Sequence, residues 1–141
     1  MGIKGLLTGE RGAKSEAIVE ARLLLAGYNV LVPRGNHLRY DCVIEDVDGK
    51  FWRVQVKTAR LAYEGTVLIF AVASSDNHTA AKRGWRSYQG QVDYFGVYSP
   101  DLDKCFLVSA HLVGTNNCTL RLVPTKNNQM KGVLWALDYA L

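Results

Sequence analysis

The stretch 38–60 constrains the fold of this 141-residue chain more than any other segment, because it predicts two paired strands. Residues 39–46 and 50–58 are rich in β-branched and aromatic residues, which favour strands. The loop 47–49 reads Val-Asp-Gly and ends with a glycine suited to the left-handed position of a three-residue hairpin loop. The segment therefore predicts a β-hairpin.

Two registers are open to this hairpin, since a two-residue turn would shift the pairing by one residue. Side chains alternate between the two faces of a strand, so this shift exchanges the faces. The two-residue turn would place Asp41 among core valines. The three-residue loop instead pairs Asp41 with Gln55, puts Lys57 on the same face, and makes the opposite face entirely apolar. That face comprises Tyr40, Cys42, Ile44, Trp52, Val54 and Val56. We therefore choose the three-residue loop.

The rest of the chain predicts a sheet with helices packed on it. Helical spacing of apolar residues predicts helices over 9–26 and 128–140. Further strands are expected at 28–33, 66–73, 92–99, 104–110 and 120–124, with 66–73 apolar throughout, as in a buried central strand. Residues 74–91 are polar and predict a loop with room for one helical turn. No repeat or proline-rich linker interrupts the chain, so we expect a single domain, 1–141, with a central mixed β-sheet flanked by helices, of the α/β or α+β class.

The composition limits which partners the protein can bind and in which compartment it can act. The net charge is +4 and the pI near 9.0, which favours nucleic acid but also fits a slightly basic solvated surface. Three cysteines without a CxxC pair predict no disulfide framework and no zinc site. No apolar run approaches the roughly 18 residues of a membrane span, and no secretory signal is recognised. We expect a cytoplasmic protein without a membrane partner.

The polar residues of the hairpin suit phosphodiester hydrolysis. That reaction needs a divalent cation, hard oxygen ligands for the cation, and a positive side chain near the charge that builds up on phosphate. Asp41 supplies a carboxylate, Gln55 an amide oxygen and Val56 its backbone carbonyl. Lys57 supplies the positive charge and could orient the attacking water. Each also has a plainer interpretation: a turn cap for Asp41, a surface residue for Gln55, and a charge that protects an edge strand for Lys57.

The order of these residues resembles the core motif of the PD-(D/E)XK nucleases. Asp41 is followed, after thirteen residues, by Gln55-Val56-Lys57, with glutamine where the family usually has a second acid. The resemblance extends over roughly residues 4–140, and is closest to the small homing-type endonucleases encoded by cyanobacterial group I introns, which have a QxK motif and are related to archaeal Holliday-junction resolvases. It is carried by KSE (14–16), GYNVLVPRGNHLRYDCVI (27–44), VQVKTAR (54–60), YQGQVDYFGVYSP (88–100) and LRLVPTKNNQ (120–129).

The resemblance implies a restriction-endonuclease-like α/β fold and a role for each matching residue. Asp41 becomes the central metal ligand, Gln55 takes the place of the second acid, and Lys57 is the catalytic lysine. Glu16 matches the helix glutamate of the family and becomes a further metal ligand, although with Glu20 it could instead form a solvated helix face. The implied ion is Mg²⁺, with Mn²⁺ as the alternative. Glutamine removes one negative charge from the site, which Glu16 would partly restore.

Basic residues near these positions are candidates for DNA binding. One group precedes Asp41, one residue follows the motif, and a third group is interleaved with Trp85 and Tyr88, which could instead anchor that loop to the core. The candidates are Arg34, His37, Arg39, Arg60, Lys82, Arg83 and Arg86.

The sequence thus predicts a Mg²⁺-dependent endonuclease that hydrolyses duplex or branched DNA. A chain with one active site must act in two copies to cut both strands, so we expect a homodimer or homotetramer. The alternative is a DNA-binding module that keeps the nuclease fold but does not cut.

Overall fold

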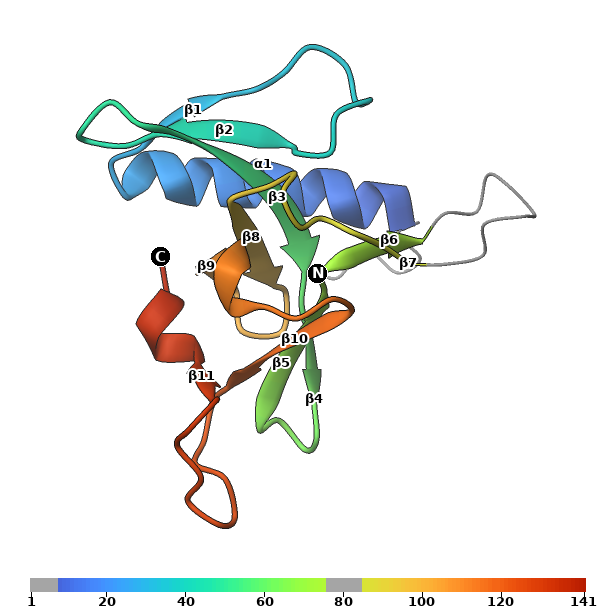
Figure 1. Cartoon of the computed structure of the whole chain (residues 1–141), viewed down its shortest axis with the longest axis vertical. Helices are drawn as coiled ribbons and strands as arrows, with labels where there is room; N and C mark the ends of the chain where they lie inside the picture. Colours follow the sequence, from blue (N-terminus) through green and yellow to red (C-terminus); the bar gives the residue numbers. More distant parts are fainter. Residues whose placement is uncertain (1–7, 76–84) are drawn as a thin grey trace.

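Three layers make up the fold in the computed structural model, which describes residues 8–75 and 85–141 (Figure 1). The helix α1 (Thr8–Leu25) covers one face of a five-stranded sheet, and a four-stranded sheet lies on the other side. The first sheet has the order β1 (Asn29–Leu31), β2 (Cys42–Glu45), β3 (Phe51–Thr58), β8 (Tyr94–Ser99), β9 (Lys104–Ser109). Only β3 and β8 are parallel in it, so the sheet is mixed, as predicted.

The second sheet has the order β11 (Leu134–Trp135), β10 (Asn117–Arg121), β5 (Val67–Ala71), β4 (Arg60–Ala62). A separate two-stranded ribbon is formed by β6 (Ala73–Ser75) and β7 (Trp85–Ser87). Two short 3₁₀ helices, Ala110–Leu112 and Ala136–Tyr139, complete the described elements. The strand expected at 66–73 is confirmed as buried and interior. It divides into β5 and β6 at Val72, whose N–H still donates to the carbonyl of Asn116, the next position in the register of β5 with β10.

The first helix packs unusually close to the sheet at one point. Val19 and Leu23 are fully buried against the first sheet, and Gly27, with a φ of 103°, follows the helix as a glycine C-cap residue should. A Cβ at Gly96 on β8 would lie only 2.7 Å from Cγ1 of Val19. Glycine at this position therefore sets how near α1 can approach β8.

The hairpin has the predicted register from Cys42 to Glu45. Cys42 pairs with Val54 and Glu45 with Phe51, and the N–H of Asp46 donates to the carbonyl of Lys50 at 2.9 Å. Gly49 has a φ of 78°, the left-handed conformation that the three-residue loop requires. Four residues of the predicted apolar face, Cys42, Ile44, Val54 and Val56, are buried under α1, and Trp52 packs against them. Tyr40 instead packs against the core on the other side of the sheet.

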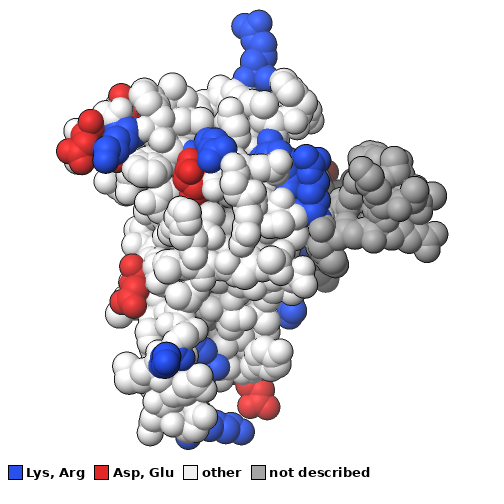
Figure 2. Space-filling model, viewed as in Figure 1, with Lys and Arg blue, Asp and Glu red and all other residues white. Residues whose placement is uncertain are grey.

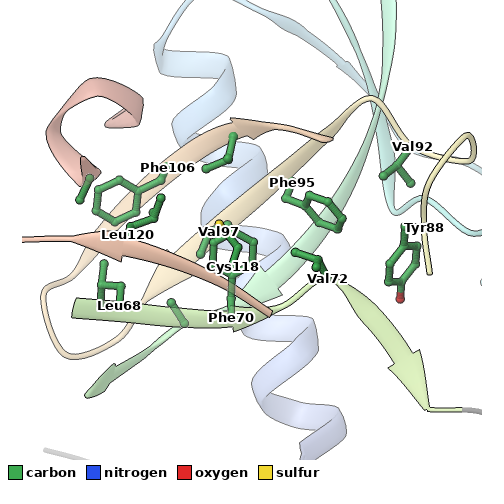
Figure 3. Close-up of a cluster of buried hydrophobic side chains, with 13 residues drawn as sticks. Leu68, Phe70, Val72, Tyr88, Val92, Phe95, Val97, Phe106, Cys118 and Leu120 are labelled. Atoms are coloured by element: carbon green, nitrogen blue, oxygen red, sulfur yellow. The ribbon is translucent and has the colours of Figure 1, made fainter. Parts of the chain in front are cut away.

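Two hydrophobic cores lie on opposite faces of the first sheet. The core under α1 contains Val19, Leu23, Val54 and Val56, together with Cys42. The larger core fills the space between the two sheets (Figure 3). It includes Leu68, Phe70, Val72, Tyr88, Val92, Phe95, Val97, Phe106, Val108, Cys118 and Leu120. Because β3 and β8 separate the two cores, alternate residues of β3 face different cores.

The helix predicted over 128–140 is wrong. Asn128 and Gly132 have φ values of 53° and 74°, which an α-helix excludes. Leu134 pairs in parallel with Leu120 of β10, so sheet pairing replaces helix formation, and only the 3₁₀ turn at Ala136–Tyr139 remains. The described residues therefore contain a single α-helix, on one face of the sheet.

The three cysteines, Cys42, Cys105 and Cys118, are free and buried. Burial raises the pKa of the Cys42 and Cys118 thiols to about 12, so both act as small hydrophobic groups. Among the described residues, no helix is both long and apolar enough to span a membrane.

Candidate active site

Asp41 lies where the regular pairing of β2 with β3 stops. Its N–H donates to the carbonyl of Val54 at 2.9 Å, although Val54 is already the register partner of Cys42. Two residues of one strand thus lie opposite one residue of the other, which is a β-bulge. The expected pair of Asp41 with Gln55 does not form, because the bulge redirects the Asp41 side chain.

The carboxylate of Asp41 occupies the edge of β3 that β2 has vacated. Its Oδ2 accepts a hydrogen bond from the N–H of Val56 at 2.8 Å. In a strand, the N–H and C=O of one residue project to the same side, so the Val56 carbonyl also points to this edge. Within the described residues, no strand pairs with this side of β3 beyond Val54. The edge therefore offers oxygen atoms to a ligand.

Glu16 meets Asp41 from the helix side. Burial, the negative charge of Asp41, a hydrogen bond with Asp41 and the charge of Glu20 together raise the pKa of Glu16 to about 7. Two carboxylates that share a site repel each other when both are ionised. A bound cation would relieve this repulsion, so the pair has the electrostatics of a cation site.

Glu20 is a third carboxylate near this pair, and the sequence argument did not assign it to the site. Burial is the larger cause that raises the pKa of Glu20, and the negative charge of Asp41 raises it further. Its spacing of four residues from Glu16 on α1 places both on one helix face, which was the available signal. Among the described residues, however, no three Asp, Glu, His or Cys side chains lie close enough together to hold a metal. Other donor atoms would have to complete the coordination.

Gln55 and Lys57 flank Val56 on β3 and lie on the opposite face of the sheet. They are register partners of Phe95 and Val97, which belong to the core between the two sheets. Gln55 is half-buried, and its amide has no hydrogen-bond partner in the part of the chain that the structure describes. Carboxylates from one face and the amide and ammonium groups from the other thus flank the edge at Val56.

Lys57 is held by Tyr88, a residue whose contribution the sequence argument left open. The Lys57 Nζ donates to the Tyr88 hydroxyl at 3.1 Å and lies 4.6 Å from the centre of its ring. The ring is buried and packs edge-on against Phe95, and Figure 3 shows the hydroxyl directed out of the core. Anchoring of Tyr88 in the core is therefore confirmed, and its hydroxyl positions the lysine.

Arg39 lies on the same aromatic ring, with Cζ 3.9 Å from the ring centre of Tyr88. Its guanidinium donates to Gln91 Oε1 and Ser74 Oγ, each at 2.7 Å, and to the carbonyls of Arg86 and Ser87, each at 3.1 Å. These bonds fasten the loop before Asp41 to the β6–β7 ribbon. Arg39 thus has a structural role, joining this loop to the ribbon, which was not predicted from the sequence.

The other candidates for DNA binding lie on the surface. Arg34 and His37 are exposed in the loop before Asp41, Arg60 is exposed at the start of β4, and Arg86 is exposed in β7. Lys82 and Arg83 lie outside the described residues. On the face drawn in Figure 2, lysine and arginine atoms gather on the side where β6 and β7 lie in Figure 1.

Comparison with known proteins decides the family. Residues 7–141 match a family model described as PD-(D/E)XK endonuclease. This chain belongs to the PD-(D/E)XK endonuclease family. The predicted resemblance is thus confirmed over nearly the whole sequence of this PD-(D/E)XK endonuclease.

A solved structure also resembles this PD-(D/E)XK endonuclease. The bacterial homing endonuclease I-Ssp6803I matches it with a TM-score of 0.73 and 21% sequence identity, over 94% of this chain and 88% of that chain. At that identity the likeness confirms the fold, which is restriction-endonuclease-like. No match was found among curated proteins.

The donor atoms of this PD-(D/E)XK endonuclease fit a hard divalent cation. Asp41 and Glu16 offer carboxylate oxygens, Val56 its carbonyl, and Gln55 an amide oxygen with no partner among the described residues. Mg²⁺ takes oxygen ligands, usually one or two carboxylates with several waters. The set therefore matches Mg²⁺ in ligand type and in the number of carboxylates.

Proposed function

We propose that this chain is a DNA endonuclease that hydrolyses phosphodiester bonds with Mg²⁺, or Mn²⁺ in its place. Membership of the PD-(D/E)XK endonuclease family supports nuclease activity and DNA as the substrate. Nucleases of this family typically use divalent metals. The specific ion, the site residues and the form of the DNA are part of this proposal.

The observation that carries the proposal is the bond from the Val56 N–H to Asp41 Oδ2 at 2.8 Å, beside Glu16. It fixes one carboxylate at an open strand edge, and the carboxylate of Glu16 lies close enough for the negative charge of Asp41 to raise its pKa. When bound there, the metal would neutralise the phosphate and lower the pKa of a coordinated water. Asp41 and Glu16 would hold the ion, and Gln55 and the Val56 carbonyl would complete its oxygen ligands.

Lys57 has a separate role in the proposed reaction. Its ammonium group is compact, positively charged and held by Tyr88 on the face opposite α1. A cation fixed in this way stabilises the negative charge that develops on the phosphate oxygens and orients the attacking water. Because Lys57 is held before the substrate arrives, little reorganisation is needed during the reaction.

A plasmid-nicking assay with Mg²⁺ tests the proposal directly. The wild-type chain should convert supercoiled plasmid to nicked or linear forms, and both Asp41→Ala and Lys57→Ala should abolish this. DNA binding, measured in parallel without metal, should persist in both variants. Removal of the metal with EDTA should stop cleavage by the wild type.

A second candidate function is a DNA-binding module that keeps the fold without cutting. The observation that favours it is Gln55 in the place of the usual acid, which lowers the negative charge at the proposed metal site. A wild-type preparation that binds DNA but nicks no substrate, in Mg²⁺ or Mn²⁺, would support this module over the enzyme.

The substrate is proposed to be either a defined duplex sequence or a branched junction. I-Ssp6803I is described as a homing endonuclease, which supports sequence-selective cutting. Cleavage of a four-way junction in preference to a linear duplex would support junction resolution instead. We also propose a homodimer or homotetramer, since one site per chain cuts one strand, and light scattering coupled to gel filtration tests this assembly.

A further inference from the structure

A cleft continues from the candidate active site along the open edge of β3. It has a volume of ≈ 860 Å³ and lies between the first turns of α1 and the strands β4 and β5. Its lining begins at Val56 and Lys57 and follows the chain through residues 58–60. A ligand that enters the proposed catalytic centre therefore has a hollow surface beside it.

Basic side chains stand on both sides of this cleft. Arg11 and Lys14 project from α1, and Arg60 from the start of β4. Of the described residues that line the cleft, only Asp101 carries a carboxylate, and this group already accepts a hydrogen bond from the N–H of Leu61 at 3.2 Å. The lining is thus strongly positive in net charge.

These three cations have no partner among the described residues. Arg11, Lys14 and Arg60 are exposed, and none has a hydrogen bond or ion pair with another residue in the described ranges 8–75 and 85–141. Arg11 also lies in the first turn of α1, where the helix dipole disfavours a cation. A cation in this unfavourable position, with no contact that compensates for it, is expected at a functional surface.

The scaffold fixes the distance between the two basic walls. Ser15 Oγ and Thr58 Oγ1 lie 2.6 Å apart, and Ser15 is buried, so this hydrogen bond joins α1 to the end of β3. Between the walls the cleft is lined by apolar side chains, among them Ile69 and Phe70 of β5. Cations at a fixed spacing over a neutral floor match a sugar–phosphate backbone, whose charged and uncharged groups alternate.

We propose that this cleft binds the backbone of one DNA strand next to the scissile phosphate, through Arg11, Lys14 and Arg60. The assignment rests on the proposed nuclease function, because it makes the cleft an extension of the catalytic centre. Phosphate contacts of this kind carry no sequence information, but they fix the register of the strand. The three residues thus hold the DNA strand so that its scissile phosphate lies beside Val56 and Lys57.

Salt-dependent binding tests the assignment. The full chain is mixed with a labelled duplex of mixed sequence in EDTA, and the Kd is measured by fluorescence anisotropy over roughly 50–200 mM salt. The variants are Arg11→Gln, Lys14→Gln, Arg60→Gln and the triple substitution. Lys50→Gln, an equal charge change at the exposed tip of the β2–β3 hairpin, is the matched control. Thermal unfolding and light scattering confirm that all variants are folded and monodisperse.

Each single substitution should make the slope of log K against log salt shallower by about 0.9, the value for one lost phosphate contact with B-DNA. The triple variant should bind about tenfold or more weakly at the low-salt end, and the control should keep the wild-type slope. A triple variant that keeps the wild-type slope refutes the cleft assignment, while the proposed function stands if the wild type still nicks plasmid. A wild-type chain that neither binds nor cuts DNA refutes both.

Discussion

The N–H of Val56 donates to the carboxylate of Asp41 at 2.8 Å, so a side chain occupies the position where the next residue of β2 would otherwise pair. This carboxylate therefore has a structural role as well as its proposed chemical one. Replacing it with alanine leaves the Val56 N–H without its acceptor, which costs about 1–3 kcal/mol if the group stays buried. Asp41→Asn keeps an acceptor oxygen and is the cleaner variant for separating cleavage from stability.

The charge at position 55 should set the affinity for metal. Gln55→Glu restores the second acid that is usual in the family, and we expect it to tighten Mg²⁺ binding about tenfold or more, whereas Glu16→Gln should weaken binding by a similar factor. Isothermal titration calorimetry of the two variants and the wild type measures this. Equal affinities in all three proteins would show that the ion binds elsewhere.

The Tyr88 hydroxyl should matter for cleavage more than for folding. Tyr88→Phe keeps the ring that packs against Phe95 and loses only the bond to Lys57, so the free energy of unfolding should fall by about 1 kcal/mol or less. The cleavage rate at saturating DNA should fall about tenfold to a hundredfold, because Lys57 loses its orientation, while the Kd for DNA stays near the wild-type value.

Tyr88→Leu serves as the comparison for this prediction, since it removes the ring as well as the hydroxyl. It should destabilise the protein markedly more than Tyr88→Phe does, because Arg39, Lys57 and Phe95 all contact the ring. Wild-type cleavage by Tyr88→Phe would contradict a positioning role for the hydroxyl.

Close contact between α1 and β8 should make Gly96 intolerant of any side chain. An alanine Cβ there would lie 2.7 Å from Val19 Cγ1 and 3.1 Å from Val54 Cγ1. Gly96→Ala should therefore lower the free energy of unfolding by about 1–3 kcal/mol, measured by urea denaturation. Gly114→Ala, where no atom lies within 4 Å, should change it by about 0.5 kcal/mol or less.

Adding Val19→Ala to Gly96→Ala tests the cause of that loss. If the clash with Val19 is responsible, the double variant should lose less than the two single losses combined, because the smaller side chain makes room for the new methyl group. Strictly additive losses would mean that the clash is not with Val19.

Acid should remove the contribution of Asp93 to stability. The side chain of Arg53 donates to the Asp93 carboxylate, with Nε to Oδ2 at 3.1 Å, and this bond lowers the pKa of Asp93. A carboxyl group with a depressed folded-state pKa stabilises the protein above its unfolded pKa of about 3.9, and loses that effect as the pH falls through the folded value. The difference in Tm between wild type and Asp93→Asn should therefore be largest near neutral pH and should shrink in acid.

Arg53→Gln provides the control for this pH dependence. In that background the effect of Asp93→Asn should be smaller at neutral pH, because the side-chain partner is gone and only the backbone N–H of Arg53 still donates to the carboxylate. A Tm difference that did not vary with pH would contradict the role of the ion pair.

The register of the hairpin was predictable, and the position of the Asp41 side chain was not. Alternation of apolar residues and the glycine at position 49 determine which residues of β2 and β3 pair, and both signals are local. The bulge at Asp41 depends on the carboxylate reaching a backbone N–H fifteen positions away and a glutamate on α1, and no local pattern encodes either contact. Asp41 was therefore recognisable as a candidate from the sequence, but its predicted neighbour, Gln55, was wrong.

The end of the chain shows the same limit. Apolar spacing after Asn127 fits a helix, but Leu134 gains a strand partner in Leu120, and Gly132 adopts a left-handed conformation that favours the turn. Tertiary pairing overrides periodicity here. Tyr88 was visible as an aromatic residue among cations, but its contact with Lys57, 31 positions away, became apparent only in three dimensions.

The open edge of β3 also has a consequence for the association of two copies of the chain. A strand edge with no neighbouring strand is a template for the addition of a strand from another copy, and proteins commonly protect such edges with charge. Arg11, Lys14 and Arg60 surround this one, so like-charge repulsion would keep two bare copies from joining there. The cations proposed to attract phosphate would then also act as gatekeepers against aggregation.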